Sequence, residues 1–108
     1  RALALVEQAQ LPAVVSSALE SSVGIATGAS LAASLPTLRY GCGLGTVSLM
    51  AEDVTDEPLI ACDGFMDLRA ITPSPQRLER LATDEQTRQW WVERVTACYQ
   101  VLERACGL

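Results

Sequence analysis

The first half of the sequence alternates between apolar runs and helix-like segments, and this alternation restricts the fold more than any other feature. Residues 13–19 contain adjacent valines in a continuous apolar run, which is typical of a buried parallel strand. Ser21 or Ser22 can cap the alanine-rich segment that follows, and Pro36 lies just past its end. Alternation with short links predicts a parallel sheet with right-handed crossovers, an α/β fold. The expected order is helix, strand, helix, strand and helix, over residues 1–10, 13–19, 23–35, 40–45 and 47–54.

From residue 56 onward the pattern changes. An Asp63-Gly64 pair stands between an extended run at 59–62 and an alternating run at 65–70, which predicts a hairpin turn. Ser74 and Pro75 then supply a cap and a first-turn proline for a short helix over 76–81. This half therefore predicts a hairpin followed by helices.

The last helix has a predicted start and a predicted buried face. Thr83 and Gln86 have the spacing of a capping box. A stripe at steps of three and four predicts that one face packs in a core. Its residues are Trp91, Val95, Cys98, Leu102 and Cys106.

Two residue types are missing from the chain. It has no histidine, and all eight basic residues are arginines, so it has no lysine. The most common general base, the most common metal ligand and every amine-based nucleophile are therefore absent. The four cysteines have no Cys-x-x-Cys spacing, which excludes a zinc site and predicts small core residues in a reducing cytoplasm.

Charge and hydropathy exclude two classes of partner. The net charge is −5 and the arginines form no basic run, so we expect no nucleic-acid binding. No run of about eighteen apolar residues is present, so we expect no membrane span. The chain starts at Arg1 rather than at a methionine, which suggests a processed chain or a piece of a longer one.

Polar and glycine residues gather at the ends of the two expected strands. The Gly41-x-Gly43-x-Gly45 turn lacks the third small residue of a dinucleotide fingerprint, because Thr46 stands there, and it is better explained as a tight turn whose amides face a pocket. Ser16 and Ser17 have no histidine or lysine to activate them, so they would donate hydrogen bonds to a ligand or cap the next helix. Glu20 is a candidate acid or metal ligand, or a charge that favours a helix N-terminus.

Two strings of residues resemble the o-succinylbenzoate synthases, which belong to the muconate-lactonizing subgroup of the enolase superfamily. The string from Val14 to Gly24 is similar to their seventh barrel strand. The string from Cys42 to Thr46 is similar to their eighth strand, and Leu49, Met50 and Asp53-Val54 resemble the helix that follows. The downstream Pro58, Asp63-Gly64 and Trp90-Trp91 also match. The resemblance covers nearly all 108 residues, but only the last third of a full-length family member.

The resemblance implies the C-terminal part of a (β/α)₈ TIM-like barrel. Residues 1–55 would supply helix 6, strand 7, helix 7, strand 8 and helix 8. Residues 56–108 would return toward the capping domain. The missing N-terminal part of the barrel would be the chain's partner.

The resemblance also implies an activity. The family consists of cytoplasmic Mg²⁺-dependent dehydratases of menaquinone biosynthesis, which convert 2-succinyl-6-hydroxy-2,4-cyclohexadiene-1-carboxylate to o-succinylbenzoate. Their base lysines and metal-binding carboxylates come from earlier strands, so no catalytic and no metal-binding residue carries over to this chain. What matches is a set of residues expected to bind the small-molecule carboxylate substrate: Ser16, Ser17, Gly43, Leu44 and Gly45.

The placement agrees with general barrel geometry, because such active sites lie at the C-terminal ends of the strands. We therefore expect Ser16, Ser17, Gly43 and Gly45 at the same end of the sheet, near one pocket. The chain alone is expected to be inactive, and marginally stable or self-associating. Alternatives are a fragment of a dipeptide epimerase or N-acylamino acid racemase, and a small stand-alone α/β interaction module.

Overall fold

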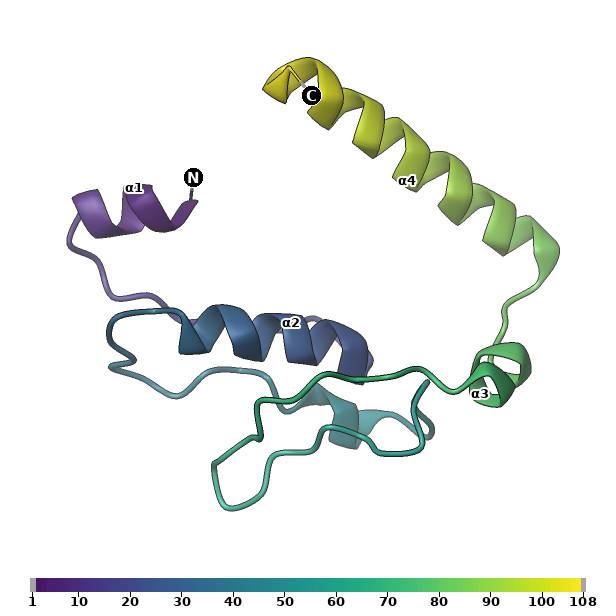
Figure 1. Cartoon of the computed structure of the whole chain (residues 1–108), viewed down its shortest axis with the longest axis horizontal. Coiled ribbons are helices and arrows are strands. Elements are labelled where there is room, and N and C mark those ends of the chain that lie inside the picture. The colour runs from purple at the N-terminus through teal and green to yellow at the C-terminus, as the bar shows by residue number, and fades with distance from the viewer. Residues whose placement is uncertain (1, 108) are drawn as a thin grey trace.

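The computed structural model of the chain describes residues 2–107 and is organised around one central helix, α2 (Ser22–Ala33). Arg1, with which the expected first helix begins, lies outside these residues. The other elements are α1 (Ala2–Gln8), the 3₁₀ helix η1 (Thr46–Leu49), α3 (Pro75–Arg80) and α4 (Glu85–Cys106) (Figure 1).

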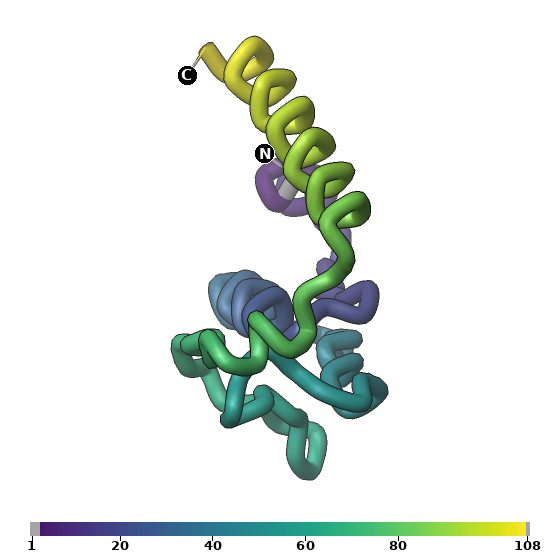
Figure 2. The backbone as a smooth tube through the Cα atoms, turned by 90° about the vertical axis from the view of Figure 1, so that its right-hand side faces the viewer, coloured from purple at the N-terminus to yellow at the C-terminus, as the bar shows by residue number. Residues whose placement is uncertain are grey.

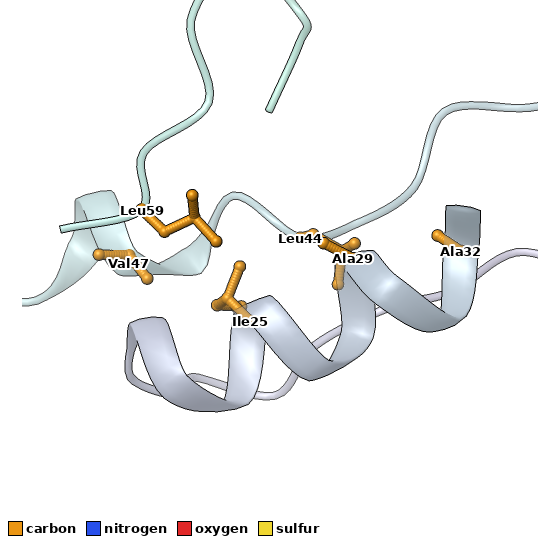
Figure 3. Close-up of a cluster of buried hydrophobic side chains, with 6 residues drawn as sticks. All are labelled: Ile25, Ala29, Ala32, Leu44, Val47 and Leu59. Carbon is orange, nitrogen blue, oxygen red and sulfur yellow. The ribbon is translucent and has the colours of Figure 1, made fainter. Parts of the chain in front are cut away.

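The core lies along one face of α2. Ile25, Ala29 and Ala32 recur at steps of four and three, so their side chains share a face, and all three are buried. Leu44, Val47 and Leu59 cover this face from the segments that follow (Figure 3). A Cβ on Gly28 would lie 2.9 Å from a Leu44 methyl carbon, so this glycine permits Leu44 to pack closely on the helix.

The two expected strands meet at a single parallel bridge, between Ser16 and Gly43. The parallel direction agrees with the prediction, but residues 13–19 and 40–45 are not strands, and no strand forms within residues 2–107. A buried strand needs a neighbour on each side, and here each run has a partner on one side only. Val14 and Leu19 are therefore exposed, as expected of strands that lack their neighbours.

The expected third helix, 47–54, was also predicted too long. Only Thr46–Leu49 is helical, and the chain turns to an extended conformation at Met50, with ψ 142°. The carboxylate of Asp53 is directed instead to the start of α2, which is incompatible with a helix that continues to residue 54.

The local signals at the hairpin and at the start of α3 were predicted correctly. Cys62 and Phe65 form an antiparallel bridge with hydrogen bonds of 2.8 and 2.9 Å in the two directions. Asp63 and Gly64 between them have φ values of 50° and 82°, as a type I′ turn requires. Ser74 is the N-cap of α3 and Pro75 is its first residue.

Helix α4 differs from its prediction in two respects. Its N-cap is Asp84, whose carboxylate accepts from the Thr87 N–H at 2.9 Å, so the Thr83–Gln86 capping box is wrong. Its apolar stripe is exposed instead of buried: Trp91 is 53% exposed and Leu102 is 57% exposed. Cys62, Cys98 and Cys106 are exposed too, and only Cys42 is half-buried, so the prediction of four core cysteines was also wrong.

The reason is visible in the arrangement of the helices. Helix α4 projects away from the layer that contains α2 in both views (Figures 1 and 2). The radius of gyration is 16.5 Å, against about 13 Å for a compact chain of this length. The accessible surface is 8460 Å², whereas a folded monomer of 11.6 kDa exposes about 5,800 Å². Among the described residues, no helix has both the length and the hydropathy to cross a membrane.

Candidate functional site

The candidate site is the point where the chain segment around Ser16 and Ser17 crosses the glycine turn. The Gly43 N–H donates to the Val15 carbonyl and the Ser17 N–H donates to the Gly43 carbonyl, both at 2.9 Å. The Ser17 hydroxyl also donates to the Gly43 carbonyl, at 2.9 Å. A Cβ on Gly43 would lie 2.7 Å from the Ser16 Oγ, so a larger residue at this position would displace the Ser16 hydroxyl. The structure thus brings together three of the five predicted residues.

Thr46 joins this group, although it is not among the residues predicted to bind the substrate. Its Oγ1 lies 2.9 Å from the Ser17 Oγ, within hydrogen-bonding distance. The N-cap of η1 is Gly45, so Thr46 is not a cap. The Ser16–Gly43 bridge places Leu44, not Thr46, opposite Ser17, so the strand pattern contains no signal for this contact.

The turn after Ser17 has an unusual backbone. Leu19 has φ 66°, a left-handed conformation that a side chain with a Cβ rarely adopts and that costs about 1–2 kcal/mol. The Glu20 carboxylate folds back and accepts from the Ala18 N–H at 2.6 Å. Strained backbone of this kind is concentrated at functional sites, because the surrounding structure must hold it in place.

Leu44 and Gly45, the remaining predicted residues, have different environments. The Leu44 side chain is buried in the core, so only its backbone can face a ligand. Gly45 is exposed and follows it along the turn. Both line a cavity of about 340 Å³ between α2 and the hairpin, together with Tyr40, Cys42 and Phe65. Ser16 and Ser17 do not line this cavity, and a single pocket shared by both sets stays a prediction.

The chemistry available at the crossing is hydrogen bonding. Hydroxyls and backbone N–H groups suit a carboxylate, because they donate to its oxygens. Ser17 is half-buried and Ser16 is exposed, so the crossing is open to solvent. Among residues 2–107, no three His, Cys, Asp or Glu side chains are placed together in a way that could hold a metal ion.

The fold and this crossing define a helix-centred unit in which two extended parallel segments meet and present hydroxyls and a glycine turn. No family model matches the sequence. Curated relatives do match it, and all three described here are named o-succinylbenzoate synthase. The Mycobacterium leprae protein is 49% identical over 97% of this chain, and the Mycobacterium ulcerans protein is 48% identical over 97%. The protein of Mycobacterium bovis strain BCG / Pasteur 1173P2 is 52% identical over 90%.

These similarities extend over almost the whole chain, and the chain is a homologue of the o-succinylbenzoate synthases. It spans only part of them, however: 31%, 32% and 29% of the length of the three relatives, respectively.

Proposed function

We propose that this chain is the substrate-binding C-terminal part of an o-succinylbenzoate synthase, which removes water from 2-succinyl-6-hydroxy-2,4-cyclohexadiene-1-carboxylate in the cytoplasmic synthesis of menaquinone. The observation that carries the proposal is the identity of about half of the residues over 90–97% of the chain. The remaining two thirds of the enzyme would be its obligate partner.

In this proposal the two extended segments are the seventh and eighth strands of a TIM-like barrel. The parallel Ser16–Gly43 bridge supports this, because neighbouring strands of such a barrel run parallel. The open outer sides of the two segments would pair with the first and sixth strands. The large accessible surface also agrees with a piece whose faces are covered by other parts of a longer protein.

The residues at the crossing would bind and orient the substrate rather than react with it. On binding, the hydroxyls of Ser17 and Thr46 would turn from the Gly43 carbonyl and from each other to donate to a substrate carboxylate. The N–H groups of Leu44 and Gly45 would also donate, while Gly43 permits the close approach and Ser16 lies at the edge of the crossing. Positioning of this kind lowers the barrier by holding the substrate in a reactive geometry. The proton transfer itself needs a base that this chain does not contain, since it lacks both lysine and histidine.

The described residues do not fit a magnesium site, since no cluster of three suitable side chains occurs among them. We therefore assign no step of the reaction on this chain to the metal. In the proposed enzyme, the ligands for Mg²⁺ would come from the preceding two thirds. Related epimerases and racemases are the competing assignment, and the names of the relatives favour the synthase.

A chimera tests the proposal. This chain replaces the matching 31% of the Mycobacterium leprae synthase, and formation of o-succinylbenzoate is followed with Mg²⁺ present. We expect turnover by the chimera and none by the 108-residue chain alone. Ser17→Ala in the chimera should raise KM about tenfold to a hundredfold, because one hydrogen bond to a charged group is lost.

Ser30→Ala is the matched control, since its hydroxyl bonds only within α2, to the Ala26 carbonyl. It should leave KM and kcat unchanged. A chimera that folds cooperatively yet shows no turnover would overturn the proposed function. So would turnover by the 108-residue chain on its own.

A further inference from the structure

A buried carboxylate lies behind the crossing, at the start of α2, and takes no part in binding as described above. Asp53 is 5% exposed, and Ser22, the first residue of α2, is 0% exposed. Both carboxylate oxygens of Asp53 accept from the Ser22 N–H, at 3.2 and 3.3 Å, and one also accepts from the Ser22 hydroxyl. The Val54 N–H donates to Asp53 Oδ1 at 2.7 Å. A buried charge with this many donors is held firmly in one place.

The same hydroxyl extends the network to a third segment. The Leu59 N–H donates to the Ser22 Oγ at 2.7 Å, and Leu59 is itself 3% exposed. The N-cap residue Ser21 contributes no side-chain capping bond. Asp53, which lies 31 positions further along the chain, therefore takes the role of the cap and fixes where α2 begins.

The start of α2 in turn fixes the turn at residues 18–20. A Cβ on Gly24 would lie 2.6 Å from the Glu20 Cβ, so Glu20 packs directly against the first turn of the helix. Glu20 accepts from the Ala18 N–H at 2.6 Å, next to the strained backbone of Leu19. Residues 18–21 are thus held between two anchors: the bridge at Ser16–Gly43 and the Ser22–Asp53 contact.

We propose that Asp53 is a positioning residue, which acts through Ser22 and the turn at 18–20 to hold Ser17 at the site that binds the substrate carboxylate. This rests on the proposed function only for the identity of the ligand. Asp53 does not touch the ligand. Its charge maintains the left-handed turn whose strain would otherwise be relieved by a shift of Ser17 away from Gly43.

Amide hydrogen exchange in the 108-residue chain, read by NMR, tests the proposal with Asp53→Asn. Asparagine has the same size and keeps one acceptor, so it removes the charge and leaves the packing. Exchange should become about tenfold to a hundredfold faster at the Ser22 and Leu59 amides, because a buried bond to a charged group is lost. It should also become several-fold faster at Ser17 and Gly43. Amides in the middle of α2, such as that of Ala29, should not change, whereas a general loss of stability would accelerate them too.

Asp67→Asn is the matched control, because Asp67 is exposed on the hairpin and undergoes the same chemical change. Ser22→Ala removes only the hydroxyl that links Asp53 to the Leu59 N–H. This substitution should accelerate exchange at Leu59 more than at Ser17. If Asp53→Asn leaves Ser17 and Gly43 unchanged, or accelerates all amides equally, Asp53 does not position the turn and the proposal is overturned.

The two proposals are separated by titration of the chimera with o-succinylbenzoate. If the unsubstituted chimera binds it and Asp53→Asn weakens binding about fivefold or more, both are supported. If the unsubstituted chimera binds it and Asp53→Asn leaves its affinity unchanged, Asp53 does not position Ser17 and the proposal is overturned. A folded chimera that does not bind the probe counts against the ligand proposed for the crossing, and the exchange pattern at Ser17 in the 108-residue chain still decides whether Asp53 holds the turn.

Discussion

The region around α2 and the helix α4 are stabilised by different kinds of contact. Around α2, long-range contacts dominate: the Ser16–Gly43 bridge, the Asp53–Ser22 contact and the cluster around Ile25 all join residues far apart in the sequence. Within the described residues, the side-chain hydrogen bonds of α4 stay inside the helix and its cap. None of its side chains is buried.

The difference shows that a strong amphipathic pattern establishes a helix without establishing what it packs against. Helix α4 has an acidic cap, a Glu85–Arg88 pair at 2.6 Å and a left-handed Gly107 at its end, all of which are local signals. The apolar face through Trp91 and Leu102 adds nothing to its stability while that face is exposed. Helix α2 has few polar residues that favour a helix end, and its stability depends on packing instead.

The largest expected effect contrasts one apolar side chain from each region. Ile25→Ala removes a side chain that is 0% exposed and should lower the free energy of unfolding of the α2 region by about 2–4 kcal/mol. Val95→Ala, on the exposed face of α4, should change it by no more than about 0.5 kcal/mol. Urea titration followed by circular dichroism and amide exchange measures both. Equal effects would mean that α4 is packed as tightly as α2, and would contradict the difference in packing between the two regions.

A smaller effect concerns the cap of α4. Asp84→Ala removes the acceptor for the Thr87 N–H, and first-turn amides should exchange about fivefold faster, while amides in α2 should not change. Thr83→Ala removes the residue that the sequence pattern favoured and should leave the first turn as it is. NMR exchange rates along residues 85–90 measure this. A larger effect from Thr83 than from Asp84 would restore the capping box and contradict the structure.

Local rules predicted the features that neighbouring residues determine. The Asp63-Gly64 turn depends on two residues that tolerate positive φ, and the start of α3 depends on an adjacent serine and proline. The sequence also correctly predicted that Ser17 and Gly43 lie close together. When one helix connects two parallel segments, the C-terminal ends of both segments lie on the same side. Whether these residues bind a substrate carboxylate stays a prediction.

The features that were missed depend on distant residues. Capping rules consider only residues next to the helix end. The role of Asp53, which lies 31 positions from Ser22, could therefore not be predicted from either residue alone. The strands at 13–19 and 40–45 need neighbours on both sides, and the burial of the α4 stripe needs a partner surface. Hydrophobic periodicity records that a face is meant to be covered, but it carries no information on whether the covering segment belongs to the same 108 residues.

The smallest expected effect lies where the α2 region leads into the C-terminal helices. Arg77 of α3 donates from Nε to Asp56 at 2.5 Å, and Arg80 pairs with Glu52. The Arg77 guanidinium, followed by the Ser74 hydroxyl, holds the pKa of Asp56 below its usual 3.8. A carboxylate with a lowered folded-state pKa stabilises the fold fully above about pH 4, and this contribution is lost as the pH falls through the lowered value.

Acidification from pH 5 to pH 2 should therefore loosen α3 from residues 52–56, and Asp56→Asn should remove this part of the pH dependence. Asp56 is exposed and Arg77 is half-buried, so solvent screens the pair. Exchange at the Leu78 and Leu81 amides should therefore change by less than about threefold, and by less still in 0.5 M salt. Asp67→Asn should keep the full pH response, because Asp67 is exposed and is not among the groups that shift the pKa of Asp56. If Asp56→Asn keeps it too, the attachment of α3 rests on its backbone contact, in which the Ser74 N–H donates to the Val54 carbonyl at 2.8 Å, rather than on the charges.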